Sequence, residues 1–299
     1  MSAGDRLRVA ACAYPIEEVA SFAAWRHKLD ALVGEAADRG ARLCVLPEYA
    51  AMELTALMAP EVRDDLAAQL EEIQALLPAY VDACAATARR HGVHLLAGSF
   101  PERVGDAYRN RARLFAPSGD SGVAEKLQMT RFERERWGVS PGEAGAVFDT
   151  ELGTLGVAIC YDAEFPLIVR RLVDAGATIV LVPSCTDTLA GHARVRVACA
   201  ARALEGQCYV VQAPTVGFAP WAPAVDENHG AAAIHGPPDR GFPDDGVVAT
   251  GELDEPGWVI GELDLAAVAA VRADGQVLNH RDWASPAHLG ATIARARLR

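Results

Sequence analysis

Short apolar runs alternate with longer stretches of helical periodicity along most of this chain. Residues 8–13 form an apolar run typical of a strand, and residues 21–39 carry apolar side chains at helical spacing until Gly40 ends the pattern. A second apolar run follows at 43–46. This succession predicts a β-α-β unit near the start of the chain.

The rest of the first half predicts a long helical region followed by paired strands. Helical spacing continues over 60–90, where we expect a break at Pro78, and a strand is expected over 93–97. The apolar runs 111–115 and 122–126 flank a Pro-Ser-Gly-Asp turn. Two such runs around a turn of this composition are typical of a β-hairpin.

The second half repeats the alternation. The expected elements are strands at 155–159, 178–182 and 208–212, helices at 166–175 and 192–205, and short strands near 231–234, 247–250 and 258–263. Strands that are apolar throughout are covered on both faces, so the pattern predicts a layered α/β protein. We interpret 214–245 as a long surface loop with an embedded strand. The range 1–299 is expected to be a single domain, with an arm from about 282 that lies over the surface or over a partner subunit.

Composition narrows the class of protein. Lysine and arginine total 28 against 40 aspartates and glutamates, a formal net charge of −12, which disfavours nucleic acid and anionic membranes as partners. The N-terminus does not resemble a targeting signal, and no apolar run reaches the roughly 20 residues that span a bilayer, so we expect a soluble cytoplasmic protein. The seven cysteines are scattered without a CxxC pair, which favours free thiols.

Three reactive side chains stand at the ends of expected strands. Glu48 follows the run LCVL-Pro, Lys126 closes the run GVAE, and Cys160 ends the glycine-punctuated run GTLGVAI. Taken singly, each has an ordinary alternative: a solvated glutamate, a surface lysine and an inert buried thiol. In α/β sheets, however, reactive groups gather where the carboxyl ends of strands meet, so these three are candidates for one site.

Together the three groups suit acyl transfer. The thiol of Cys160 is the expected nucleophile, Glu48 accepts and returns its proton, and Lys126 stabilises the oxyanion of the tetrahedral intermediate. In water the thiol and carboxyl pKa values differ by roughly 4 units, which opposes this proton transfer. Burial that raises the pKa of Glu48, and a Lys126 charge that lowers the pKa of Cys160, are expected to close the gap.

The motifs around these residues resemble a known family. PEYA around Glu48, EKLQMTRFERE around Lys126 and CYDAEFP around Cys160 resemble, in this order, the three signatures of the nitrilase superfamily of carbon–nitrogen hydrolases, and the likeness extends over nearly the whole chain. The resemblance implies a four-layer αββα sandwich and a Glu-Lys-Cys triad. It also implies a second glutamate near the lysine, for which Glu133 fits best and Glu135 is the rival.

The same resemblance implies an activity. The backbone N–H of Tyr161 is expected to complete the oxyanion hole. CYD resembles the amidase-type branches, so we expect a small amide or carbamoyl substrate, cleaved through a cysteine thioester without a metal or cofactor. Many relatives read CYDxxFPE, whereas position 167 is Leu167, which leaves the subgroup open. A nitrile substrate, acyl transfer to an amine and a non-catalytic scaffold remain alternatives.

A homodimer or higher homo-oligomer is expected from the resemblance, through the helices at 166–175 and 192–205.

For several other features of the sequence we favour a structural explanation over a functional one. His91 and His94 form an HxxH pair without a third ligand nearby, which argues against zinc. A Cys-His scheme with a histidine base is the competing nucleophile arrangement; the candidate bases are His192, His229 and His235. We interpret Arg131 and Arg134 as surface charge rather than as a carboxylate-binding pair, and Trp137 and Trp221 as packing residues.

Overall fold

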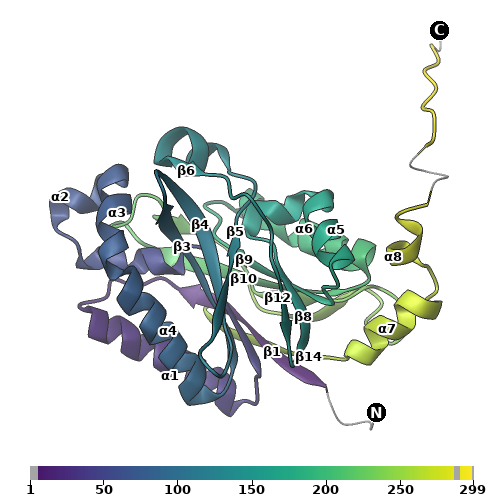
Figure 1. The fold of residues 1–299 in the computed structure, drawn as a ribbon, viewed down its shortest axis with the longest axis horizontal. Coiled ribbons are helices and arrows are strands. Elements are labelled where there is room, and N and C mark those ends of the chain that lie inside the picture. The colour runs from purple at the N-terminus through teal and green to yellow at the C-terminus, as the bar shows by residue number, and fades with distance from the viewer. Residues whose placement is uncertain (1–5, 286–289, 298–299) are drawn as a thin grey trace.

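The computed structural model describes residues 6–285 and 290–297, and its core is one mixed β-sheet (Figure 1). The main path of the sheet runs in the order β5-β4-β3-β2-β1-β10-β9-β8-β7, and the remaining strands attach to β1, β4 and β10 or to one another. The strands are β1 (Leu7–Pro15), β2 (Leu43–Leu46), β3 (His94–Val104), β4 (Ala107–Phe115), β5 (Ser121–Glu125), β6 (Val139–Ser140), β7 (Val147–Thr150), β8 (Gly153–Val157), β9 (Ile179–Ser184), β10 (Tyr209–Phe218), β11 (Glu227–Asn228), β12 (Ala233–His235), β13 (Val247–Thr250) and β14 (Gly257–Leu263).

Helices cover both outer faces of this sheet. The α-helices are α1 (Phe22–Asp38), α2 (Pro60–Arg63), α3 (Leu66–Ile73), α4 (Leu77–His91), α5 (Pro166–Asp174), α6 (Leu189–Gly206), α7 (Leu265–Asp274) and α8 (Asn279–Asp282). Short helical turns of other types are η1 (Ala50–Leu57), η2 (Gln74–Leu76), η3 (Glu133–Trp137) and η4 (Cys160–Glu164). Among the described residues, none of these helices combines the length and the apolar composition needed to cross a membrane.

The sheet turns back on itself at β1 and β10, so that its two halves face each other. Val9 and Val45 of one half share a hydrophobic cluster with Leu155 and Leu181 of the other half. The alternate residues of the first half point the other way: Ala10 and its neighbours pack against α1 and α4. Side chains of α5 and α6 cover the second half. The result is the αββα arrangement of layers predicted from the sequence.

Local sequence explains where the covering helices begin and end. Helix α1 starts after Ser21, whose hydroxyl accepts a hydrogen bond from the amide of Ala24 at 3.1 Å. Trp25, Leu29 and Val33 recur at helical spacing on its buried face. Helix α4 ends at Gly92, which has a φ of +62°, a conformation that glycine adopts without steric strain.

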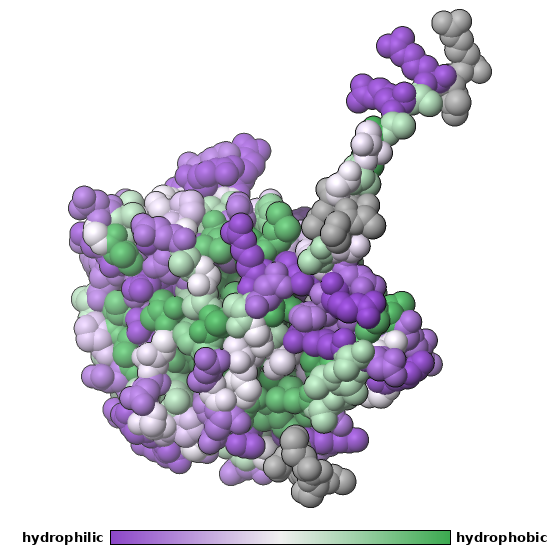
Figure 2. Space-filling model, turned by 45° about the vertical axis from the view of Figure 1, so that its right-hand side comes forward, coloured by the Kyte–Doolittle hydropathy of each residue, from purple (hydrophilic) through white to green (hydrophobic). Residues whose placement is uncertain are grey.

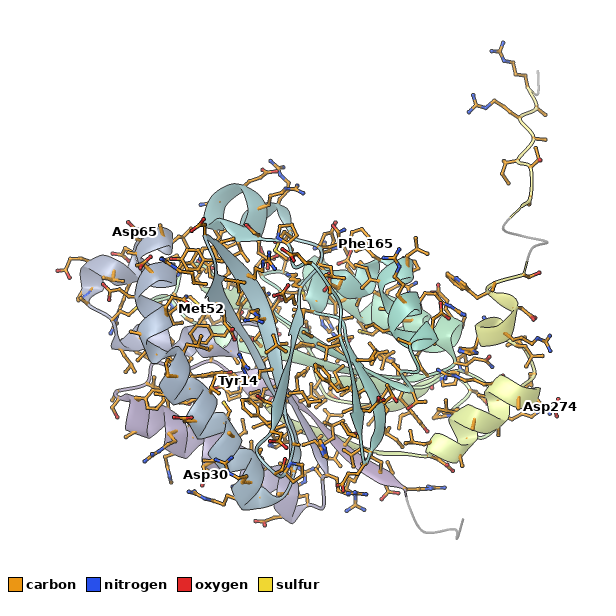
Figure 3. The ribbon with its side chains drawn as sticks, viewed as in Figure 1. Tyr14, Asp30, Met52, Asp65, Phe165 and Asp274 are labelled. Atoms are coloured by element: carbon orange, nitrogen blue, oxygen red, sulfur yellow. The ribbon has the colours of Figure 1, made fainter. Side chains whose placement is uncertain are left out.

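The long helical region expected over 60–90 is divided differently from the prediction. It consists of α2, α3, η2 and α4, and Asp65 caps α3 by accepting hydrogen bonds from the amides of Ala67 and Ala68 (Figure 3). Pro78 lies in the first turn of α4 rather than at a break. A proline there loses no helical hydrogen bond, because the first N–H groups of a helix have no partner within it.

The segment 214–245 was predicted as a surface loop with an embedded strand, and the first part of this prediction is wrong. Strand β10 continues to Phe218, and Ala219, Ala222 and Val225 beyond it belong to the hydrophobic cluster under η1 and α3. Proline and glycine mark turns in this segment, but the small apolar residues between them are buried.

The C-terminal arm expected from about 282 is described only in part. Helix α8 ends at Asp282, and residues 290–297 carry no helix or strand, are exposed and extend away from the body of the molecule (Figure 1). Residues 286–289 and 298–299 of the predicted arm lie outside the described residues. The single-domain interpretation stays a prediction.

Candidate active site

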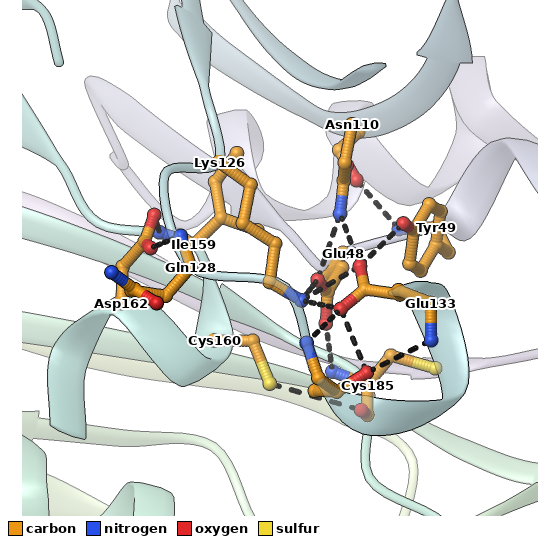
Figure 4. Close-up of polar contacts among 12 residues, drawn as sticks. Glu48, Tyr49, Asn110, Lys126, Gln128, Glu133, Ile159, Cys160, Asp162 and Cys185 are labelled. Carbon is orange, nitrogen blue, oxygen red and sulfur yellow. Dashed lines mark hydrogen bonds and ion pairs between the residues drawn. The ribbon is translucent and has the colours of Figure 1, made fainter. Parts of the chain in front are cut away.

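Three strand ends bring Glu48, Lys126 and Cys160 to one buried place (Figure 4). Glu48 lies two residues after β2, Lys126 directly follows β5, and Cys160 begins η4 shortly after β8. The exposed fractions of the three residues are 1%, 1% and 4%. Side chains of such different charge are therefore enclosed together and interact with little screening by water.

The ammonium group of Lys126 lies between two carboxylates. Its Nζ is 2.7 Å from Oε1 of Glu48, and it is 2.8 Å and 2.7 Å from the two carboxylate oxygens of Glu133. Burial by itself would lower the pKa of Lys126, but the two carboxylates outweigh burial and raise this pKa well above its usual range. Lys126 is accordingly a fixed positive charge at this site.

Glu133 is held as the charged partner of that lysine. Burial favours its protonated form, but Lys126 and hydrogen bonds from Tyr49 and Thr130 outweigh burial and lower the pKa of Glu133. The phenol of Tyr49 donates to Oε1 at 2.6 Å, and the amide and hydroxyl of Thr130 donate to Oε2 at 2.9 Å and 2.8 Å. The rival Glu135 is exposed and pairs with Arg131 at 3.0 Å, so it does not reach Lys126.

Glu48 is less strongly held in its charged form. Its Oε1 accepts hydrogen bonds from Lys126 and from the side-chain amide of Asn110 at 2.9 Å, and its Oε2 accepts one from the backbone amide of Cys185 at 3.1 Å. Burial, opposed by Lys126 and reinforced by the charge of Glu133, raises the pKa of Glu48 to about 7. A carboxyl group with this pKa both accepts and returns protons near neutral pH.

The thiol of Cys160 is held in a sharp turn at the start of η4. Cys160 has a φ of +48°, an uncommon conformation for a residue with a side chain, and its Sγ lies 3.8 Å from the carbonyl oxygen of Cys185. Burial and the nearby Glu48 raise the pKa of Cys160 well above its usual range, although Lys126 opposes them. Lys126 acts on the Cys160 thiol in the expected direction, but burial is the larger effect, so the net pKa of Cys160 is raised.

Tyr161 occupies the second position of η4. The first N–H groups of such a turn point away from any carbonyl within it, which makes the amide of Tyr161 a suitable donor to an oxyanion on the Cys160 side. The Tyr161 ring packs edge-on against Phe165, with ring centroids 4.9 Å apart.

Several residues that contact the site were not predicted from the sequence. Tyr49 and Asp162 stand inside the PEYA and CYD motifs, where position next to a reactive residue was an available signal. Asn110 and Cys185 carried no such signal, because one lies inside a strand and the other in a loop after β9. Only the folded chain brings these two to Glu48.

Trp137 and His229, which are not part of the predicted triad, make other contacts. Trp137 is 3% exposed and packs against Tyr49 with ring centroids 4.7 Å apart, so it contacts a residue of the site rather than the triad itself. His229 contacts Asp254 and Glu227, at 2.9 Å and 3.2 Å. Among the described residues no histidine is hydrogen-bonded to Cys160. Glu48, in contrast, is close enough to the Cys160 thiol to raise its pKa.

His91 of the HxxH pair contacts Asp30 at 3.1 Å. Within the part of the chain that the structure describes, no group of three or more His, Cys, Asp or Glu side chains is arranged to hold a metal ion.

A model of the carbon–nitrogen hydrolase family matches residues 8–273. The chain belongs to the carbon–nitrogen hydrolase family. This assignment confirms the resemblance drawn from the three motifs, which all lie within the matched range.

Individual members of the family show how far the likeness reaches. Probable hydrolase YhcX of Bacillus subtilis (strain 168) is 33% identical over 277 residues, 92% of this chain and 53% of that protein, so the chain spans about half the length of this relative. Deaminated glutathione amidase of Synechocystis sp. (strain PCC 6803 / GT-S) is 30% identical over 265 residues, 84% of this chain and 89% of the relative.

A solved structure shares the fold. A double mutant of the amidase from Nesterenkonia sp. AN1 in complex with acrylamide has a TM-score of 0.67 at 22% identity, over 95% of this chain and 99% of that chain. The fold class predicted from the sequence is thereby confirmed.

Proposed function

We propose that this protein hydrolyses the C–N bond of a small amide or carbamoyl compound through a thioester on Cys160. The observation that carries the proposal is the meeting of one thiol, one carboxyl group of raised pKa and one fixed ammonium in a single buried site. These are the nucleophile, the proton carrier and the oxyanion stabiliser that acyl transfer needs.

The first half of the cycle forms the thioester. The Sγ of Cys160 bonds to the amide carbonyl carbon while its proton passes to Glu48, which suits a thiol that is protonated at rest and a carboxyl group with a pKa of about 7. Lys126 and the Tyr161 N–H hold the oxyanion. The C–N bond then breaks as Glu48 returns the proton to the departing ammonia or amine.

The second half releases the acid. Glu48 takes a proton from water, the resulting hydroxide oxygen bonds to the thioester carbon, and the C–S bond breaks as the proton returns to Cys160. Glu133 holds Lys126 in place throughout, because both of its carboxylate oxygens contact the ammonium. No step requires a metal or an organic cofactor.

The substrate class rests on similarity. Relatives at 27–30% identity are named as an omega-amidase and a deaminated glutathione amidase, which supports an amide over a nitrile for this chain. The thioester is common to hydrolysis and to acyl transfer. A panel of ω-amides, carbamoyl-amines and nitriles, scored for ammonia release with and without an added amine, separates these outcomes. Release from nitriles alone would contradict the amide proposal.

We also propose that two copies pair through α5 and α6. Leu167 and Val197 on these helices are 67% and 60% exposed, which is unusual for large apolar side chains. A shallow hollow along α6 is lined by the small residues Ala193, Ala198 and Ala201 beside Val197, with the charged Glu164, Arg194 and Arg202 around them, and the small side chains let a second helix approach closely. On the side turned forward in Figure 2, apolar side chains stand among hydrophilic ones.

A further inference from the structure

Asn110 is a buried amide that contacts the candidate active site from the side opposite the thiol (Figure 4). It lies on β4 and is 0% exposed. Its Nδ2 donates hydrogen bonds to Oε1 of Glu48 at 2.9 Å and to Oε1 of Glu133 at 3.5 Å. Its backbone carbonyl accepts a hydrogen bond from the amide of Lys126 at 2.9 Å. One residue therefore touches both carboxylates and the backbone of the lysine between them.

The orientation of this amide shows what its side chain does. Nδ2 carries two hydrogens, and each faces a carboxylate, while Oδ1 has no hydrogen-bond partner among the described residues. A buried acceptor without a partner is unfavourable, but the flipped amide would point that oxygen at two negative oxygens, which is worse. The amide therefore serves as a donor to the carboxylates.

We propose that Asn110 is a positioning residue that holds Glu48 and Glu133 in their charged, lysine-facing geometry. This role rests on the proposed function, because it acts through Glu48 as the proton carrier. A donor to a carboxylate stabilises the charged form, and two carboxylates share only one ammonium here. The side-chain amide of Asn110 is an additional donor, and it stabilises the negative charge that one ammonium does not neutralise.

Replacing Asn110 by leucine tests the role, because leucine keeps the volume and removes the donor. The readout is alkylation of Cys160 by iodoacetamide as a function of pH, located by peptide mass. We expect the acid limb of this profile to move up by about one pH unit in Asn110→Leu, because the pKa of Glu48 rises when a donor is lost. Ammonia release from a responsive amide should fall about fivefold in kcat at pH 7, with KM unchanged, because the ionised fraction of Glu48 falls by this factor.

A matched control is Gln207→Leu, which removes another buried amide far from the site. Gln207 is 1% exposed and donates to the backbone carbonyls of Val271 and Val277, each at 3.1 Å. This variant should lower the free energy of unfolding but leave the pH profile at its wild-type position. An Asn110→Leu profile that coincides with the wild-type profile would overturn the proposal.

A second variant covers the case in which Asn110→Leu does not fold. Asn110→Asp keeps the shape and replaces the donor by a third carboxylate, so it should move the acid limb upward by more than leucine does. An unchanged or lowered limb would overturn the role of Asn110. If wild-type protein shows this alkylation profile but releases ammonia from no compound of the panel, the proposed function fails while the positioning role stands.

Discussion

The carboxylate of Asp162 accepts a hydrogen bond from the backbone amide of Gln128 at 2.7 Å, and this contact joins the segment after Lys126 to the turn that begins at Cys160. It also accepts from the amides of Leu127 and Ile159, at 3.1 Å and 3.3 Å. Asp162 is 1% exposed. Its carboxylate thus ties the backbone after Lys126 to the turn that carries Cys160, which fixes the spacing of ammonium and thiol.

Asp162→Asn is expected to loosen this tie. An amide offers one acceptor oxygen in place of two, and its NH₂ group would face backbone N–H donors. We expect the free energy of unfolding to fall by about 1–3 kcal/mol and kcat to fall with it. Urea unfolding and ammonia release measure the two effects.

The control for this variant is Asp264→Asn at the start of α7. Asp264 also accepts from two backbone amides, those of Ala266 and Ala267, but it lies away from the site. The Asp264→Asn variant should have a lower free energy of unfolding and a wild-type kcat. Equal kcat values for Asp162→Asn and wild type would show that Asp162 has no part in positioning.

Glu133→Gln should move the pH dependence of activity downward. The negative charge of Glu133 raises the pKa of Glu48, and the amide would remove that charge and leave Lys126 to act on Glu48 alone. The acid limb of the kcat/KM profile should therefore fall below about 7, while kcat decreases because Lys126 loses a partner. Glu135→Gln serves as the exposed control and should leave the limb unmoved. An upward shift in Glu133→Gln would contradict the account.

Glu48→Gln should stabilise the folded protein at high pH. Burial raises the pKa of Glu48 from its ordinary 4.5 to about 7. For a raised acid, stability is fully present below the unfolded-state pKa and is lost as pH rises through the folded-state pKa. Above pH 7 the free energy of unfolding of wild type therefore falls by about 3 kcal/mol. A glutamine at position 48 does not ionise, so the variant shows no such fall.

Urea unfolding of wild type and Glu48→Gln at pH 4.5 and pH 8.5 measures this difference. The variant should be the more stable protein at pH 8.5, with little difference at the lower pH. A variant that is less stable at pH 8.5 would mean that Glu48 contributes net attraction in the ion-pair cluster, contrary to this account.

Val197→Lys should separate the proposed dimer. The lysine replaces an exposed apolar side chain of the α6 face by a charge close to Arg194, and burying this additional positive charge between two copies is unfavourable. Light scattering at micromolar concentration should report a dimer for wild type and a monomer for this variant. Leu253→Lys, at a residue that is 46% exposed outside α5 and α6, should stay dimeric. A monomeric wild type would refute the pairing.

The sequence predicted the parts of this site that follow from strand ends. Glu48, Lys126 and Cys160 each follow a short apolar run, and the carboxyl ends of such strands meet at one edge of the sheet. Glu133 was separable from Glu135 only by resemblance, because both lie in one charged turn. Their different burial follows from how that turn packs on Tyr49.

Asn110 and Cys185 show why the rest was not predictable. Asn110 reaches Glu48 across 62 positions of the chain, and Cys185 reaches it across 137. Pairings of this range depend on the order of strands in the sheet, which periodicity does not encode. The same applies to the pKa of Cys160, since its direction depends on burial within the assembled site.

The most direct test is intact-mass measurement of the protein mixed with an amide that releases ammonia. Wild type should gain the mass of the acyl group during turnover, and Cys160→Ala, with an unchanged circular dichroism spectrum, should gain none and release no ammonia. Ammonia release by folded Cys160→Ala at the wild-type rate would contradict the central claim that Cys160 carries the acyl group.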